Sequence, residues 1–173
     1  GIDGVGKTTL SRLLVDELMK RGIKAIRYED VEEKGSGFNL IKPFVKAQPS
    51  INSSLLFYIA SAIYKSQQIE RLLNNNWVIC DRYIYSTLAY HKIRKADMSL
   101  ISNMKNFPIL ILIPDFSFLI KTSDSVRLRR IKARSGNNVY DLKIKTDRNF
   151  VGKMEKELEA FNLTIIDNSR PNP

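Results

Sequence analysis

The sequence contains few of the residues that mark secreted or metal-cluster proteins. Cys80 is the only cysteine and His91 the only histidine among 173 residues, which excludes an internal disulfide and a site made of several soft metal ligands. We expect Cys80, within the apolar run 77–81, to pack as a small hydrophobic side chain. We expect His91 to be a loop residue after Tyr90 rather than a catalytic group.

Long apolar runs are also missing. None approaches the roughly 18 residues that are needed to cross a bilayer, and no basic and apolar leader opens the chain. We therefore expect a protein that has no contact with membranes and works in the reducing cytoplasm.

The charge balance favours an anionic ligand. Lysine and arginine number 28 against 18 acidic residues, a formal charge of +10, which suits a nucleotide, a nucleic acid or an acidic lipid. The basic residues are spread along the chain without interleaved aromatic residues, which favours a solvated surface over a nucleic-acid groove. Examples are Lys42, Lys46, Lys92, Arg94 and Lys95.

Apolar periodicity predicts alternating helices and strands. Helices are expected at 7–21, 55–73, 86–90, 124–134 and 145–161, and strands at 23–28, 77–80, 116–120 and 163–166. The connection 29–53 should be irregular or partly helical. This alternation is typical of an α/β fold with a doubly wound parallel sheet and helices on both faces, and the length fits one domain, 1–173. We expect that a first strand leading into Gly1 is missing from the sequence.

The first eight residues match the phosphate-loop pattern G-x-x-x-x-G-K-[ST]. The expected first helix follows directly on Gly1-Ile2-Asp3-Gly4-Val5-Gly6-Lys7-Thr8. In such a loop, backbone N–H groups point at phosphates and the positive end of the helix dipole lies behind them. Lys7 would reach the β- and γ-phosphates of ATP, and the Thr8 hydroxyl would hold Mg²⁺. The alternative is a glycine-rich turn that merely precedes a helix.

Asp81 and Arg82 follow the expected strand 77–80. Their side chains should emerge at the carboxyl edge of the sheet, where open α/β folds bind ligands. Asp81 is then a second Mg²⁺ contact, and the planar guanidinium of Arg82 would hold a transferring phosphoryl group. The alternative is a charged surface pair at a strand end.

Three segments together resemble the thymidylate kinase family of nucleoside monophosphate kinases. They are the phosphate loop extended to Thr9, Pro114-Asp115 before a strand, and Asp81-Arg82-Tyr83-Ile84-Tyr85-Ser86-Thr87-Leu88-Ala89-Tyr90. The resemblance spans nearly the whole chain. It implies a three-layer P-loop fold with a five-stranded parallel sheet, a mobile arginine-bearing lid, and transfer of the γ-phosphoryl group of ATP to thymidylate (dTMP), giving dTDP.

The resemblance also implies the residues of the site. The ATP-binding set is Gly1, Asp3, Gly4, Val5, Gly6, Lys7, Thr8, Thr9 and Asn168, the last in a late loop near the adenine. The acceptor set is Asp3 at the sugar 3′-hydroxyl, Phe57 stacked on the base, Ser61, Arg82, Ser86 and Tyr90. The catalytic set is Lys7, Asp81, Arg82, Arg130 and Arg134, with the lid at about 134–147.

Two departures from the family concern the acceptor. The family has an arginine followed by a Glu-Pro-Gly turn after the second strand, and this chain has Arg27-Tyr28-Glu29-Asp30. Four residues after Phe57, where the family reads thymine with an arginine, the chain has Ser61. We expect the acceptor to lose charge-assisted hydrogen bonds worth about 1.5–3 kcal/mol each.

Two other functions stay open from the sequence. The ATP site also suits a kinase of nucleosides or other small hydroxyl compounds, with the Glu29-Asp30 pair as general base. A nucleotide-binding regulator with a degenerate acceptor site is the non-enzymatic alternative. Thymidylate is the leading acceptor, and the resemblance adds a homodimer formed through helices.

Overall fold

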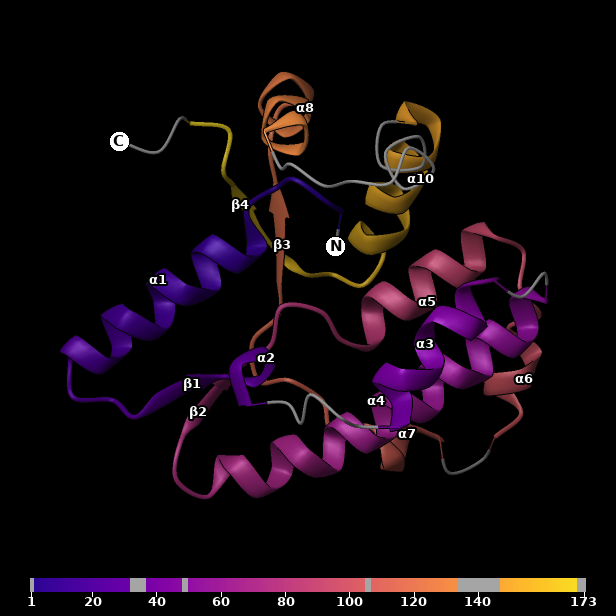
Figure 1. Ribbon diagram of the computed structural model, residues 1–173, viewed down its shortest axis with the longest axis horizontal. Helices are drawn as coiled ribbons and strands as arrows, with labels where there is room; N and C mark the ends of the chain where they lie inside the picture. The colour runs from indigo at the N-terminus through magenta and orange to yellow at the C-terminus, as the bar shows by residue number, and fades with distance from the viewer. Residues whose placement is uncertain (1, 32–36, 48–49, 105–106, 134–146, 171–173) are drawn as a thin grey trace. The chain divides into compact units, whose positions relative to one another are not determined.

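The computed structural model describes residues 2–31, 37–47, 50–104, 107–133 and 147–170, which form two compact units. The first unit contains residues 1–10 and 114–173, and the second contains residues 11–113. Each unit holds one pair of parallel strands (Figure 1). Gly1, Arg134 and the expected lid up to residue 146 lie outside the described residues.

In the second unit, a pair of short parallel strands follows helix α1. This helix (Lys7–Lys20) begins in the first unit and continues into the second. Gly22 follows it with a φ of +78°, the left-handed conformation that commonly ends a helix. The chain then enters β1 (Ala25–Arg27), which pairs in parallel with β2 (Trp77–Ile79). Both strands lie within the ranges that the sequence predicts.

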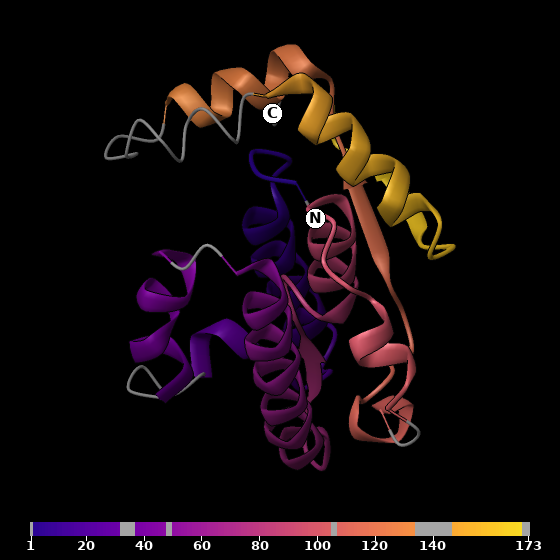
Figure 2. The same cartoon turned by 90° about the vertical axis from the view of Figure 1, so that its right-hand side faces the viewer.

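Short and long helices make up the rest of the second unit. They are α2 (Tyr28–Val31), α3 (Gly37–Ala47), α4 (Ile51–Leu73), α5 (Ile84–Ile93), α6 (Ser99–Ser102) and α7 (Phe107–Leu110). Helix α4 begins four residues earlier than expected, because the Ser50 hydroxyl accepts a hydrogen bond from the Ser53 N–H at 3.2 Å. Helices α3 and α5 both lie beside α4 (Figure 2).

The core of the second unit forms where α4 meets the helices that follow it. Its buried members are Leu55, Ile59, Ala62, Ile84, Ala96, Ile101 and Ile111. The first three share one face of α4, since they recur at helical spacing. Within the described ranges, no helix combines the length and apolar character needed to cross a membrane.

The first unit is built on β3 and β4. β3 (Phe118–Lys121) pairs in parallel with β4 (Thr164–Asp167). Helix α8 (Asp124–Lys132) follows β3, and α10 (Arg148–Glu159) leads to β4. Asp147 caps α10 by accepting hydrogen bonds from two backbone N–H groups of its first turn.

The helices and parallel strands confirm the α/β class, whereas the five-stranded sheet is not what the structure shows. The described residues contain two separate two-stranded sheets, β1–β2 and β3–β4. Each strand has only three or four residues, and the fifth expected strand would precede residue 1. Helices on both faces of one sheet, and a single domain, stay predictions.

His91 is a buried helical residue, so the prediction of a loop position is wrong. It lies in α5 and its side chain is 1% exposed. Its Nδ1 donates to the Thr87 carbonyl at 2.8 Å, which leaves Nε2 of the neutral ring to accept from the Ser54 hydroxyl at 3.0 Å. Burial lowers the pKa of His91 below 6.5; the Thr87 bond opposes this shift, and nearby Arg94 adds to it.

The buried histidine predicts a loss of stability in mild acid. The unfolded chain binds a proton at His91 near pH 6.5, while the folded chain resists it, so the free energy of unfolding falls as the pH drops below about 6.5. The slope from this group is at most about 1.4 kcal/mol per pH unit. Urea unfolding of the wild-type protein and of His91→Gln between pH 5 and 8 measures how the free energy of unfolding depends on pH. An equal slope in both proteins would contradict the prediction.

Candidate functional site

The phosphate loop takes the shape that its glycines permit. Gly4 and Gly6 have φ of +85° and +95°, a region that other residues rarely adopt. Val5 between them is fully buried, and α1 begins at Lys7. These residues turn the backbone sharply just before the start of α1, which is where the motif predicts an anion site.

Helix α8 packs directly behind the loop. A Cβ atom on Gly4 would lie 2.9 Å from the Arg127 carbonyl oxygen and 2.9 Å from Ile131 Cγ1. Glycine is therefore needed at this position for space as well as for φ. Arg127 is 1% exposed, and its Nε donates to Asp124 Oδ1 at 3.2 Å, so a paired cation lies buried in the helix behind the loop.

Two predicted site residues lie against the same carbonyl of the loop. Asn168 Nδ2 donates to the Val5 oxygen at 2.9 Å, and Arg130 Nη1 donates to it at 3.4 Å. Both residues come from the carboxyl side of a strand in the first unit, Arg130 from α8 after β3 and Asn168 from the loop after β4. The first unit thus brings Arg130 and Asn168 together with the phosphate loop.

The other predicted residues of the loop differ in contacts and exposure. Lys7 folds back so that Nζ donates to the carbonyl of Ile2. Thr8 and Thr9 are exposed at the start of α1, and Asp3 is half-buried. The ammonium group of Lys7 therefore already lies over its own loop.

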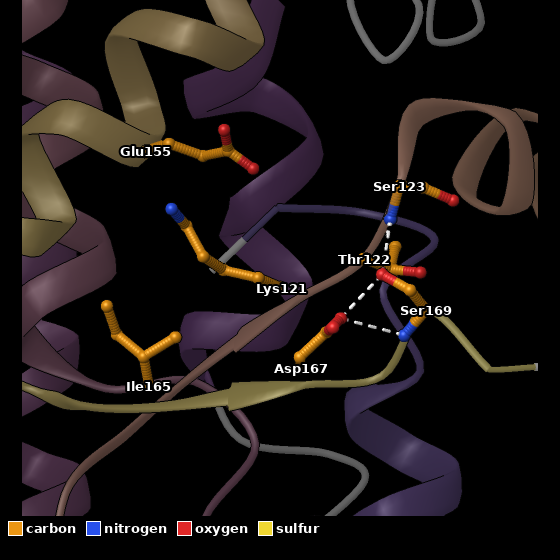
Figure 3. A pocket seen from close by; sticks show the side chains of 7 residues that line it. All are labelled: Lys121, Thr122, Ser123, Glu155, Ile165, Asp167 and Ser169. Carbon is orange, nitrogen blue, oxygen red and sulfur yellow. Dashed lines mark hydrogen bonds between the residues drawn. The ribbon is translucent and has the colours of Figure 1, made fainter.

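A small polar pocket lies at the carboxyl ends of β3 and β4 (Figure 3). Its volume is about 310 Å³. Its lining residues are Lys121, Thr122, Ser123, Glu155, Ile165, Asp167 and Ser169. The carboxyl ends of parallel strands are where α/β folds bind ligands. The pocket adjoins Asn168, which is next in the chain to two of these residues.

In the second unit, Asp81 emerges just after β2 as predicted. Its side chain is largely buried, at 11% exposed, and Oδ2 accepts a hydrogen bond from Arg27 Nη2 at 3.4 Å. Its backbone N–H donates to Glu29 Oε1 at 3.0 Å. Arg27, which ends β1, and Glu29, which follows it, thus hold Asp81 at the carboxyl edge of the β1–β2 pair.

Arg27 is a site candidate that the sequence reasoning missed. It ends β1, is 4% exposed, and its Nε donates to the Ser11 hydroxyl at 2.9 Å. The departure from the family lies in the residues after Arg27, which form α2 (Tyr28–Val31) where the family has a turn. The signal in the sequence is an arginine at the end of the expected strand 23–28. This strand pairs with the strand that precedes Asp81.

Lys65 of α4 completes the charged cluster around Asp81. Its Nζ lies 3.9 Å from Glu29 Oε1, 3.4 Å from the Arg82 carbonyl oxygen and 4.5 Å from the centre of the Tyr28 ring. Two cations, Arg27 and Lys65, therefore lie among two carboxylates. Such pairing offsets the cost of removing charges from water.

Cys80 lies within this cluster rather than among hydrophobic side chains. Its Sγ is 3.1 Å from the Arg82 carbonyl oxygen and 3.5 Å from Glu29 Oε1. Burial raises the pKa of the Cys80 thiol to about 12, while nearby Lys65 opposes the shift. The thiol stays protonated at neutral pH and donates to these oxygens.

Arg82 and Ser86 lie where the chain enters α5. The Arg82 side chain is exposed, and Tyr83 caps the helix and bonds to the Ser66 hydroxyl. The Ser86 N–H donates to the Tyr83 carbonyl at 3.1 Å. Arg82 therefore extends from a fixed backbone, as a group that contacts a ligand needs to.

Aromatic rings gather on α4 around Phe57. The Phe38 ring of α3 lies 5.6 Å from Phe57 and 5.4 Å from Tyr64. Half-buried Ser61 stands between these two residues of α4 in the sequence. Tyr90 lies on α5, where its ring is 5.1 Å from His91. The structure therefore gives Phe57 an aromatic neighbour that the sequence did not predict.

The described residues contain no group of three or more histidine, cysteine or acidic side chains that could hold a metal ion. Mg²⁺ does not require such a group, because it is usually bound by one or two carboxylates together with water and substrate phosphates. Asp81 and Thr8 offer the hard oxygen donors that this ion prefers.

Comparison with known proteins gives one consistent result. The family model described as thymidylate kinase matches residues 1–172. A thymidylate kinase of Orientia tsutsugamushi is 31% identical over 173 residues, covering 96% of this chain and 74% of the relative. A thymidylate kinase of Prochlorococcus marinus is 34% identical over 80% of this chain and 70% of the relative. A probable thymidylate kinase of Methanococcus aeolicus is 32% identical over 83% and 69%.

With a phosphate loop at its start, an aspartate and an arginine after β2 and a family match over almost its full length, this chain belongs to the thymidylate kinase family of P-loop α/β proteins.

Proposed function

We propose that this protein is an ATP-dependent kinase that transfers the γ-phosphoryl group of ATP to dTMP, giving dTDP. The observation that carries the proposal is the phosphate loop just before α1, in which left-handed Gly4 packs against α8 and left-handed Gly6 against Asn168. The family match over residues 1–172 supplies the acceptor.

In the ATP half of the proposed site, residues from Asp3 to Thr9 hold the phosphates. Phosphoryl transfer needs donors aimed at oxygens on which negative charge develops. Lys7 supplies one such charge, and Arg130, which already lies 3.4 Å from the Val5 oxygen, is close enough to the loop to supply another. Gly1 belongs to the same proposal through the phosphate-loop motif, and Arg134 through the resemblance to the family's arginine-bearing lid.

Mg²⁺ is part of the proposal. The hydroxyl of Thr8 and the carboxylate of Asp81 are the residues that would hold it. The ion, when bound, neutralises charge on the phosphate oxygens and so favours in-line transfer. Arg27 and the Glu29 bond to the Asp81 backbone support the fit, because they fix the carboxylate at the strand end.

In the acceptor half, Arg82 and Phe57 carry the main contacts. Arg82 is exposed and positively charged, which suits the acceptor phosphate, and the Phe57 ring offers a face for the base. Ser61, Ser86 and Tyr90 border the same proposed pocket, and Asp3 meets the sugar hydroxyl. Arg27 is too deeply buried to be the main phosphate contact without movement of its neighbours.

The nucleoside kinase alternative requires a carboxylate that is ready to take a proton. Glu29 Oε1 accepts from the Asp81 N–H at 3.0 Å, and Oε2 lies 3.8 Å from Arg27. Oε1 is therefore engaged by a fixed donor, while Oε2 is buried beside the Arg27 cation and has no hydrogen-bond partner among the described residues. The burial of this carboxylate favours a structural role over that of a general base.

A homodimer and a cytoplasmic location are also part of the proposal. The exposed apolar residues Leu40, Ile41 and Phe44 of α3 suit an interface formed by helices.

Replacing Lys7 with alanine should lower kcat by at least roughly 100-fold, because a charge aimed at the phosphates is lost. The fold should stay intact, since Lys7 is only half-buried. A coupled ADP assay measures kcat, and circular dichroism tests whether the fold is intact. Lys20→Ala, at the exposed far end of α1, is the control. Wild-type turnover of the Lys7 variant would refute the phosphate-loop assignment.

Replacing Asp81 with asparagine should lower kcat/KM by about tenfold or more, which corresponds to about 1.4 kcal/mol. The Mg²⁺ concentration for half-maximal rate should rise, because an amide binds this ion more weakly than a carboxylate. Titration of the rate with Mg²⁺ measures both effects, and Asp16→Asn, an exposed aspartate of α1, is the control. An unchanged Mg²⁺ dependence would show that Asp81 has only a structural role.

Base selectivity among acceptors should be poor, because Ser61 replaces an arginine that reads thymine. A hydroxyl group discriminates weakly, so deoxyuridylate should compete with dTMP within about tenfold, or about 1.4 kcal/mol. Ser61→Arg should sharpen the preference for dTMP, whereas Ser61→Ala should not.

The measurement is kcat/KM for dTMP, deoxyuridylate, deoxycytidylate and thymidine at saturating ATP and Mg²⁺. Tight and selective turnover of dTMP by the wild-type protein would mean that another residue reads the base. Turnover of thymidine alone would favour the nucleoside kinase, and no turnover of any acceptor would favour the nucleotide-binding regulator.

A further inference from the structure

We propose that Asn168 is a positioning residue that fixes the phosphate loop through the Val5 carbonyl, so that it supports polyphosphate binding whatever base the nucleotide carries. The inference rests on the proposed function in one respect, that the loop binds phosphates. It assigns to Asn168 a role different from the adenine contact that the family resemblance implied.

The backbone at Asn168 is fixed on both sides by the end of β3. Its N–H donates to the Lys121 carbonyl at 2.8 Å, and its own carbonyl accepts from the Thr122 hydroxyl at 2.9 Å. The side chain of Asn168 therefore starts from a rigid base.

The residues on either side of Asn168 hold the turn closed (Figure 3). The Asp167 carboxylate accepts from the N–H and the hydroxyl of Ser169, and the Ser169 hydroxyl accepts from the Ser123 N–H at 2.9 Å. These bonds from Ser169 lower the pKa of Asp167, so the carboxylate stays charged and the turn stays closed at neutral pH.

The bond from Asn168 decides which way the Val5–Gly6 peptide faces. A trans peptide is planar, and its C=O and N–H groups point in opposite directions. No cis peptide bond is present among the described residues. Because Asn168 Nδ2 holds the Val5 oxygen at 2.9 Å, the Gly6 N–H must point away from Asn168. In a phosphate loop, such backbone N–H groups are the phosphate donors.

Asn168 packs closely against Gly6 as well as against the Val5 carbonyl. A Cβ atom on Gly6 would lie 2.5 Å from Asn168 Nδ2. Arg130 Nη1 reaches the same oxygen only at 3.4 Å, which is a longer and weaker bond. Asn168 is therefore the main partner of the Val5 carbonyl, and Arg130 stays able to turn towards a bound phosphate.

A binding experiment separates a positioning role from a base contact. Titration calorimetry measures Kd for Mg²⁺-ATP, Mg²⁺-GTP and Mg²⁺-tripolyphosphate, the last having no base, with wild type, Asn168→Ala and Asn168→Asp. Asn149→Ala is the matched control, because it makes the same change at an exposed position of α10 in the same unit. Melting temperatures identify any variant that does not fold.

We expect Asn168→Ala to weaken binding of all three ligands by the same factor, roughly two- to tenfold, as the loss of one hydrogen bond predicts. Asn168→Asp, which keeps the shape, should weaken it more, because a carboxylate cannot donate to the Val5 oxygen and repels phosphates. Weaker binding of ATP with unchanged binding of tripolyphosphate would overturn the proposal in favour of an adenine contact. Unchanged binding of all three would also overturn it, whereas a wild-type protein that binds none of them would overturn the proposed function itself.

Discussion

The close packing of the phosphate loop on its own unit is the constraint on which the ATP half of the site depends. A Cβ atom on Gly4 would lie 2.9 Å from the Arg127 carbonyl oxygen of α8, and one on Gly6 would lie 2.5 Å from the Asn168 amide nitrogen. Both glycines also have φ values that other residues rarely adopt. Both positions therefore favour glycine, and this allows the tight backbone turn whose N–H groups the motif assigns to phosphate binding.

A second constraint, buried charge, shapes the other unit. Arg27 is almost fully buried at the end of β1, and its guanidinium interacts with Ser11, Asp81 and Glu29. A buried ion is tolerated only where partners replace water, so these contacts determine where Asp81 can stand. The carboxylate proposed for Mg²⁺ is thus held in place by Arg27 and Glu29.

Local patterns predicted most elements but not all of them. Strands β1 to β4 and helices α1, α4, α5, α8 and α10 overlap the predicted ranges, because their apolar periodicity is strong. Helices α6 and α7 have four residues each, too few for a periodic signal. Helix α3 contains Pro43, which reads as a helix breaker, yet it forms where Phe38 packs on the rings of α4.

The sequence by itself determined the phosphate loop and the family, because both depend on contiguous residues whose order carries the chemistry. Only the tertiary structure decided the roles that depend on distant partners. Asn168 bonds to a carbonyl 163 positions away, and Arg27 to a carboxylate 54 positions away. His91 became a buried, neutral side chain because α4 packs against α5 and brings Ser54 to its ring. Residue spacing along the chain does not predict such contacts, because they form only when the helices and strands pack together.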